Sequence, residues 1–304
     1  MFTFHLSSHL SSRVRGGLAL CWILLAMALA AQAQTQASCT FQFFSPTTPF
    51  KLHNGKPVFI EPLGINDFGR IVGYASPGTV HGLIRWPNGS VTRVKETSFL
   101  RGDNDHNTSV GEDVTDQGIV LNGSTITPIV LDVNNGGVSE AKGINNSGTI
   151  IGRYQPPNHN GAHGFKRFNN GTTHTLDFPG AMPGTTEPYG INDNGIVVGL
   201  YEAPDASVHG FIFNKGQWAT LDYPHASFTV LVGITNDGRI IGTADTVNFS
   251  TKQFLYENGT FKVISVPNLN PGTGGLLSIS PKRGLILGVT TANAGDPAFI
   301  AQCQ

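Results

Sequence analysis

Short apolar runs of four to six residues alternate along the chain with polar stretches rich in Gly, Asn and Asp. The runs favour β-branched and aromatic residues, as at 196–198 and 211–213. They are too short for helices and are bounded by turn residues, so they predict β-strands. Asn-Gly at 88–89 and 258–259 supplies the positive φ angles that tight hairpins require. The pattern therefore predicts an all-β chain built of hairpins.

One phrase recurs, Gly-Ile-Asn-Asp-x-Gly-x-Ile-Val-Gly. It stands at 64–73, 143–152, 190–199 and 233–242, and less complete copies are predicted at 113–120 and 278–288. The starts lie 49, 30, 47, 43 and 45 residues apart. This spacing predicts six copies of one unit, the second shortened, with a polar, irregular segment at 98–112 before it. The residues assigned to repeat structure are Gly64, Asn66, Gly143, Asn145, Gly190, Asn192 and Gly233, with His81, His163 and His209.

Each unit has the same internal order. After the Gly-Ile-Asn phrase comes His-Gly-Phe or a relative, as at 209–211, then a turn, then a closing run such as Leu-Asp-Phe-Pro at 176–179. Pro ends the last strand, because it has no backbone N–H to donate to the hydrogen bonds between strands. Four strands in about 45 residues are typical of a β-propeller blade. A β-helix has shorter coils without paired hairpin turns, and an open hairpin array would leave its edges exposed.

The two ends of the chain favour a closed ring. The last unit stops one strand short after 298–301, and Cys39–Pro46 reads as the missing strand followed by its Pro. We therefore predict a β-propeller of about six blades, one degenerate, closed by the N- and C-terminal strands. Closure would place Cys39 beside Cys303, so a disulfide is predicted there.

The first 33 residues are predicted to be a cleaved signal peptide. Arg13 and Arg15 precede an apolar stretch at 18–30, and Ala-Gln-Ala at 31–33 supplies a cleavage pattern. Residues 34–304 are then one exported domain, extracellular or periplasmic. No later run approaches the ~20 apolar residues of a membrane span.

The units resemble the HAF-family extracellular repeat of bacteria. The resemblance rests on the phrases at 190–199, 209–211 and 176–180, and covers most of residues 60–301. The sequence departs from the family pattern in the second unit, and the fifth and sixth units lack the His. It implies a secreted, propeller-like protein and brings no catalytic residue or ligand.

The charge of the chain limits the classes of partner that it is expected to bind. Lys and Arg number 19 against 20 Asp and Glu, and charged residues make up 13% of the chain. A basic surface for nucleic acid is not expected. We expect a monomer that binds an extracellular glycan or protein.

Two sets of residues are candidates for a metal or acid–base site. His81, His163 and His209 occupy equivalent places in different blades, so bonds within each blade are favoured over a shared metal or acid–base set, and no zinc spacing is present. The alternation of Asp103, Asp105 and Asn107 suggests calcium, although Thr108 and Val114 exclude an EF-hand. No cofactor other than calcium is predicted.

The motifs favour a binding or scaffold module. The sequence has no Gly-x-Ser-x-Gly elbow and no phosphate-cradling loop. The alternative is an exported glycan-active hydrolase or lyase whose carboxylates face the central channel. Two carboxylates about 5–10 Å apart in one pocket would support that enzyme.

Overall fold

Every regular element that the structure describes is a β-strand, as the apolar runs predict. The computed structural model describes residues 35–51, 55–76, 81–131, 137–157, 161–246, 250–269, 274–291 and 297–304. The predicted signal peptide at 1–33 lies outside the described residues. Within that described part, no helix is long and apolar enough to cross a membrane. Gln36–Gln304 form one compact unit.

The strands fall into six groups with a common order along the chain. Group 1 is β4 (Pro57–Ile65), β5 (Ile71–Ser76), β6 (Gly82–Arg85) and β7 (Val91–Val94). Group 2 is β8 (Thr97–Asp103), β9 (Thr108–Asp113), β10 (Gly118–Asn122) and β11 (Thr125–Pro128). Group 3 is β12 (Val138–Ile144), β13 (Ile150–Gln155), β14 (His163–Arg167) and β15 (Thr173–Leu176).

The later groups follow the same order. Group 4 is β16 (Glu187–Ile191), β17 (Val197–Glu202), β18 (Val208–Asn214) and β19 (Gln217–Thr220). Group 5 is β20 (Ala226–Ile234), β21 (Ile240–Thr246), β22 (Thr251–Glu257) and β23 (Thr260–Val263). Group 6 is β24 (Gly275–Ile279), β25 (Ile286–Val289), β26 (Ala298–Cys303) and, from the chain's start, β2 (Cys39–Phe44). The remaining strands are β1 (Thr35–Gln36) and β3 (Thr47–Lys51), which pairs with β4.

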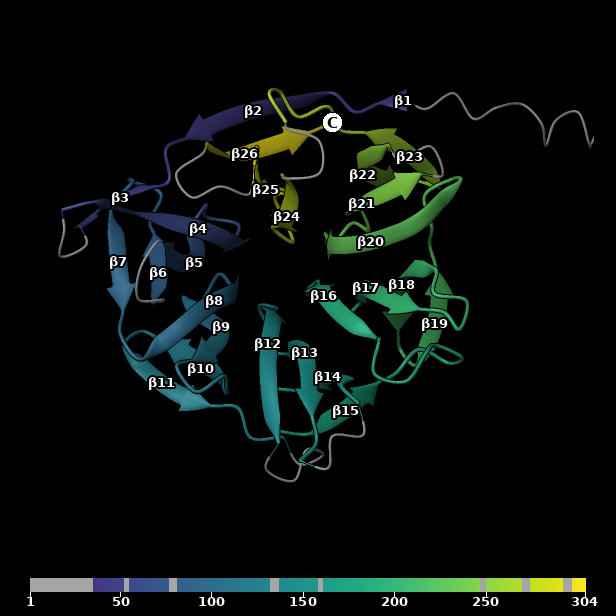
Figure 1. Ribbon diagram of the computed structural model, residues 1–304, viewed down its shortest axis with the longest axis horizontal. Coiled ribbons are helices and arrows are strands. Elements are labelled where there is room, and N and C mark those ends of the chain that lie inside the picture. The colour runs from purple at the N-terminus through teal and green to yellow at the C-terminus, as the bar shows by residue number, and fades with distance from the viewer. Residues whose placement is uncertain are drawn as a thin grey trace, which may run out of the picture. The chain divides into compact units, whose positions relative to one another are not determined.

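Strand pairing among the described residues gives five sheets. Groups 2, 3 and 6 are four-stranded sheets, and group 1 gains β3 as a fifth strand. A parallel pair, Val208 with Phe228, joins groups 4 and 5 into one nine-stranded sheet. Within every group, neighbouring strands are antiparallel, as the hairpin turns predict. The small sheets are arranged like the blades of a propeller (Figure 1).

The prediction for the second repeat is wrong. The segment expected to be irregular, 98–112, forms most of β8 and β9, so this repeat has four strands like the others. Gly102-Asp-Asn-Asp105 takes the place of the Gly-Ile-Asn-Asp phrase, while 113–120 spans the following hairpin. Asp103 stands where other repeats have Ile, which interrupts the apolar pattern. Asn107, with φ 60°, supplies the left-handed conformation that Gly69, with φ 78°, supplies in group 1.

The first strands of the groups lie toward the middle of the arrangement of sheets (Figure 1). They contact one another in chain order, β4, β8, β12, β16, β20 and β24, and β24 also contacts β4. Glycines permit this approach. A Cβ on Gly190 would collide with the Cα of Gly233 in the next group. This close packing is the physical reason for the first Gly of the repeated phrase.

The core lies between consecutive groups. Ile151 and Leu176 of group 3 pack with Val197 and Phe211 of group 4, and all four are fully or almost fully buried. Burying one such side chain contributes about 1.5–3 kcal/mol. Phe211 is the aromatic of the His-Gly-Phe phrase, and its counterparts Phe165, Phe254 and Phe299 are also completely buried. In these four groups the phrase therefore marks a strand whose aromatic side chain belongs to the core.

The chain's two ends meet in group 6. β2 lies beside β26 (Figure 1) and runs antiparallel to it, with Cys39 opposite Cys303. The two cysteines form a disulfide. The predicted disulfide is confirmed. Disulfides persist in oxidising surroundings, so the bond indicates an extracellular or periplasmic environment.

Candidate binding site in the central pocket

A belt of asparagine side chains ties the first strands together. Asn145 accepts hydrogen bonds at Oδ1 from the N–H groups of Ser147 and Thr149, which closes its own turn. Its Nδ2 donates to the carbonyl of Asn192 in the next group at 3.0 Å. The same donation links neighbouring groups from Asn66 to Asn104, Asn104 to Asn145, and Asn192 to Thr235. Asn145 therefore both closes its own turn and bonds the next group.

A second belt uses the residue after each asparagine. The backbone N–H of Asp105 donates to Oδ1 of Asn146 at 2.8 Å, and that of Asn146 donates to Asp193 at 2.9 Å. Between groups 6 and 1, the N–H groups of Lys282 and Arg283 donate to Oδ1 of Asp67 at 2.9 and 2.7 Å. The belts fix the ends of the first strands, and with them the walls of the space between those strands.

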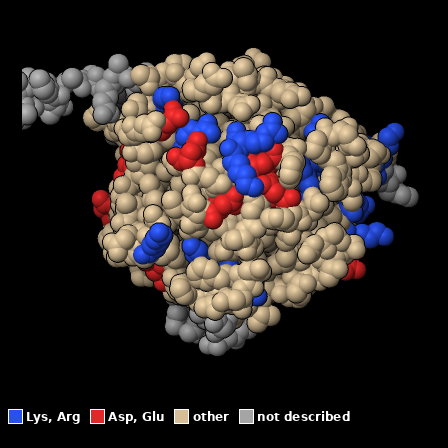
Figure 2. All heavy atoms as spheres, turned by 180° about the vertical axis from the view of Figure 1, so that it is seen from behind, with Lys and Arg blue, Asp and Glu red and all other residues tan. Residues whose placement is uncertain are grey.

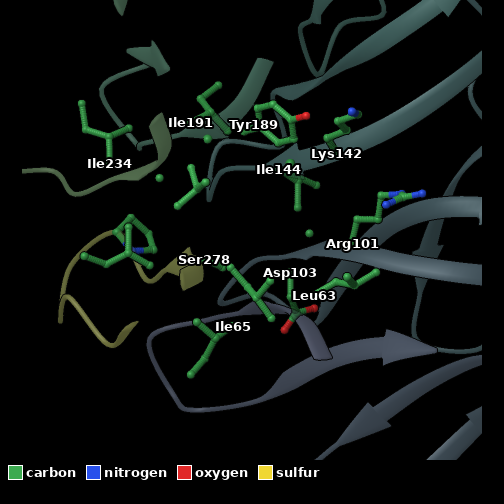
Figure 3. Close-up of a pocket in the computed structure, with 18 of the residues that line it drawn as sticks. Leu63, Ile65, Arg101, Asp103, Lys142, Ile144, Tyr189, Ile191, Ile234 and Ser278 are labelled. Atoms are coloured by element: carbon green, nitrogen blue, oxygen red, sulfur yellow. The ribbon is translucent and has the colours of Figure 1, made fainter. Parts of the chain in front are cut away.

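The first strands enclose a cavity of about 230 Å³. Its deeper wall is mostly aliphatic. Figure 3 shows Ile65, Ile191 and Ile234 on one side of it. Leu63, Val232 and Leu277 add further apolar surface. We call this space the central pocket.

Three polar side chains form the mouth of the central pocket. In Figure 3 the polar ends of Arg101, Lys142 and Tyr189 lie on the side away from Ile65 and Ile234. They occupy equivalent positions on β8, β12 and β16. Each lies directly before the Gly of its repeat, and the residue after that Gly is buried. In groups 1, 5 and 6 the same position holds Leu63, Val232 and Leu277. One half of the mouth is therefore polar and the other half apolar.

Acidic partners hold the mouth side chains in place. Arg101 pairs with Glu112 at 2.6 Å, and Lys142 pairs with Glu187 at 2.9 Å. The Tyr189 hydroxyl donates to Glu187 at 2.8 Å, and burial together with this carboxylate raises the pKa of Tyr189. Burial opposes ionisation of Glu187, but Lys142 and its other partners outweigh burial and lower its pKa. These contacts pre-order the side chains of the mouth.

Asp103 is the acidic residue among those that line the pocket. Its side chain is fully buried, and Oδ1 accepts from Arg70 at 2.9 Å and from Ser109 at 2.8 Å. Among the described residues, Oδ2 has no hydrogen-bond partner. Burial raises the pKa of Asp103 to about 7, although Arg70 and Ser109 act in the opposite direction. The carboxyl group of Asp103 is therefore buried behind the pocket wall, with one oxygen that has no partner among the described residues.

The calcium candidates lie in the turn between β8 and β9. Asp103 pairs with Arg70, and Asp105 pairs with Lys282 at 2.9 Å. Asn107 lies 3.5 Å from Arg70. Among the described residues, no three His, Cys, Asp or Glu side chains are grouped to hold a metal ion. Calcium at these residues stays a prediction, and any ion there would compete with two basic side chains.

The three histidines do not line the central pocket. His163 bonds Asp177 at 2.8 Å and His209 bonds Asp222 at 2.7 Å, each within its own group. Burial lowers the pKa of His81, as do two nearby basic side chains. The carboxylates of Asp177 and Asp222 are thus the partners of these two histidines.

Sequence reasoning missed the pocket mouth. Arg101 lies in the segment expected to be irregular, and Lys142 and Tyr189 each precede a recognised Gly-Ile-Asn phrase. A signal exists: the residue before the repeated Gly, or before Ser278 in the sixth repeat, is Leu63, Val232 or Leu277 in some repeats and polar in these three. A correct alignment of the second repeat would have revealed the set.

One face of the molecule is seen from behind in Figure 2. Most of its described surface is uncharged, and the basic and acidic side chains near its middle stand beside one another. A broad field of one sign is therefore not seen on the described part of that face, in keeping with the balanced composition.

No protein-family model and no curated protein matches the sequence. Among solved structures, a gluconolactonase from Xanthomonas campestris matches with a TM-score of 0.51 at 10% identity, covering 89% of this chain and 97% of that one. TolB from Acinetobacter baumannii matches with a TM-score of 0.53 at 12% identity, covering 78% of this chain and 65% of that one. The fold is a β-propeller. At such low identity, these similarities carry the fold and nothing finer.

Proposed function

We propose that this chain is an exported, non-catalytic β-propeller that binds a segment of a partner protein in its central pocket. The predicted signal peptide, the resemblance to HAF-family repeats and the disulfide support export. The proposal keeps the predicted six blades, with groups 4 and 5 counted separately because a single parallel pair joins them. It leaves the disulfide and the repeated phrases as structural features, and assigns binding to the pocket.

Three contacts between groups 6 and 1 support closure of the ring by the terminal strands. β24 contacts β4. Leu287 packs in one cluster with Ile60, and both are completely buried. The N–H of Lys282 donates to Asp67. Closure matters for function because it gives the pocket a continuous wall.

The chemistry of the pocket lining carries the proposal of binding rather than catalysis. Among the described residues that line it, Asp103 is the one carboxylate. Acid–base cleavage of a glycosidic bond by the usual route uses a pair of carboxyl groups that flank the bond. The pocket offers instead two cations, a tyrosine and an aliphatic wall, which are groups that hold and orient a ligand.

The aliphatic wall favours a protein segment over a glycan. Sugar rings carry hydroxyl groups on most of their carbons, and a hydroxyl that loses water against Leu63, Val232 and Leu277 would find no partner there. An unbranched side chain loses no hydrogen bond in the same place. The charged mouth can bind the polar backbone or terminus from which such a side chain extends.

Binding arrays test this function. Purified protein is applied to a peptide array and to a glycan array, beside a Leu277→Arg variant that fills the mouth and an Ala219→Arg control on exposed β19. We expect peptide binding by the wild type and the control, and at least a tenfold loss for Leu277→Arg. Binding of glycans alone, or binding unaffected by Leu277→Arg, would contradict the proposal.

A further inference from the structure

A serine, a histidine and an aspartate of group 4 are joined by hydrogen bonds outside the central pocket. Oγ of Ser207 lies 2.7 Å from Nε2 of His209, and Nδ1 of the same imidazole lies 2.7 Å from Oδ2 of Asp222. Serine nucleophiles are activated by contacts in this order, since the hydroxyl faces a base and an acid orients that base. None of the three residues lines the central pocket. We call them the Ser207 triad.

We propose that Ser207 is a nucleophile that accepts one acyl group from an activated ester, an ester of a phenol. The oxygen of Ser207 forms a bond to the acyl carbon while its proton passes to Nε2 of His209. The bond from the acyl carbon to the phenol oxygen breaks, and that oxygen leaves with the bonding electron pair. The phenol then receives the proton from His209. The products are an ester at Ser207 and a free phenol.

Strand pairing fixes the imidazole of His209. Ser207 comes directly before β18 and His209 is its second residue, so the two side chains share a face of the strand. Tyr201 pairs with His209 across β17 and β18, and its ring stacks on the imidazole with 5.2 Å between centroids. Asp222 follows β19, and its Oδ1 accepts from the N–H of Gly210 at 3.1 Å. An ionised carboxylate only accepts hydrogen bonds, so Nδ1 of a neutral imidazole carries the proton and Nε2 can receive one.

A reagent can reach the Ser207 triad from solvent. The side chains of His209 and Asp222 are 28% and 33% exposed, and Ser207 is half-buried. Asp205, in an exposed loop, accepts from the hydroxyl of Ser207 at 2.5 Å and from its N–H at 3.1 Å. The hydroxyl has a single proton, so it donates to Asp205 or to His209 at any moment. The exposed carboxylate of Asp205 can bond water instead, which leaves the proton for His209.

The serine separates group 4 from group 3. Group 3 has the same base and acid, since His163 lies 2.8 Å from Asp177 and its ring lies 5.3 Å from that of Tyr154. At the place of Ser207, two residues before the histidine, group 3 has Gly161. Of these two groups, group 4 alone adds a hydroxyl to the histidine–aspartate pair.

The surroundings of Ser207 favour one acylation over repeated turnover. Enzymes that hydrolyse esters direct donors, often backbone N–H groups, at the oxygen that becomes negative. The N–H of Ser207 is instead bonded to Asp205, and that of Gly210 to Asp222. A phenol leaves readily without such donors, whereas hydrolysis of the acyl-serine must expel the more basic serine oxygen. Ser207 should therefore be acylated quickly and released slowly, which adds a covalent site to a protein whose central pocket binds without catalysis.

Acylation by p-nitrophenyl acetate tests the proposal on the full protein. The wild type should release close to one equivalent of nitrophenol per chain in a burst, followed by a much slower phase. Mass spectrometry should find the acetyl group on tryptic peptide 168–215, whose one serine is Ser207. Ser90 is the internal control, because its hydroxyl bonds Asn88 in the same kind of turn and has no histidine among its described contacts. Its peptide, 86–93, should stay unmodified.

Variants assign the roles within the Ser207 triad. Ser207→Ala should lose the burst, and His209→Gln and Asp222→Asn should each slow it at least tenfold. Ser90→Ala should leave the burst unchanged, and Asp205→Asn, which keeps an acceptor for the turn, should not slow it.

The wild-type peptide map needs no variant, so it decides the question even where a triad variant fails to fold. An unmodified Ser207, or a burst that depends on Asp205 and not on His209, would overturn the inference. Neither result bears on peptide binding in the central pocket, so the proposed function is tested separately.

Discussion

At the scale of single residues, Asp103 departs furthest from the repeat. It replaces an Ile that lines the pocket in the other groups, and it pairs with the almost fully buried Arg70. A buried ion pair gains little net stability, because both charges lose their hydration. The pair with Arg70 therefore adds little to the stability of the fold.

Replacement of Asp103 by Asn should change how stability depends on pH. Burial raises the folded-state pKa to about 7 from an ordinary 3.8, so between these values the folded chain holds a proton that the unfolded chain has released. The free energy of unfolding therefore falls as pH rises through this window, by on the order of 4 kcal/mol from this group. In Asp103→Asn this fall should disappear.

Urea unfolding at pH 4.5 and pH 8 measures the effect. The decrease in unfolding free energy between the two pH values should be smaller in Asp103→Asn than in the wild type by a few kcal/mol. Asp205→Asn, at an exposed loop position, is the control and should keep the wild-type decrease. An equal decrease in Asp103→Asn and wild type would show that Asp103 does not titrate in this window.

At the scale of elements, the repeated phrase encodes contacts between strands as much as turns. The first Gly lets neighbouring first strands approach, and the Asn closes its own turn while bonding the next group. The last Gly lies against the neighbouring strand, since a Cβ on Gly199 would collide with the carbonyl of Glu187 and the ring of Phe211. Each of these recurring residues thus has its own physical reason to stand at its place in the repeat.

Loss of one belt asparagine should destabilise the whole domain. Asn192 is completely buried; it accepts from the N–H of Ile196 at 3.0 Å and donates to Thr235 at 2.9 Å. Asn192→Ala leaves both groups without a partner, at an expected cost of about 2–4 kcal/mol. Chemical denaturation measures it. Asn214→Ala, on the exposed end of β18, should change stability by less than about 0.5 kcal/mol, and equal effects of the two would refute the belt's importance.

Much of the element scale could be predicted from the sequence, and the failures have identifiable causes. The order of strands, the hairpin turns and the buried Phe of the His-Gly-Phe phrase follow from pattern alone. The second repeat escapes correct alignment because Asp103 and Asn107 replace Ile and Gly, which hides the phrase from a search for apolar periodicity. The bonds of His163 and His209 to aspartates depend on how neighbouring strands align, which spacing does not reveal.

At the scale of the whole molecule, the ends of the chain and its centre are linked. The pairing of β2 with β26 and the disulfide bring the termini into one sheet. A bridge that spans 264 residues constrains the unfolded chain by about 5 kcal/mol in the chain-entropy model. The terminal residues predicted this pairing. The pocket could not be predicted in the same way, because it is formed by six strands distant in sequence and its polar half comes from only three of them.

The claim that the central pocket is the ligand site is tested most directly by blocking it. Val232→Cys places a thiol in the pocket, and Ala219→Cys places one on the exposed outer strand β19. Both variants are labelled with a bulky maleimide and applied to the peptide array. The account predicts that labelling abolishes binding by Val232→Cys and leaves binding by Ala219→Cys unchanged. Full binding by labelled Val232→Cys would contradict it.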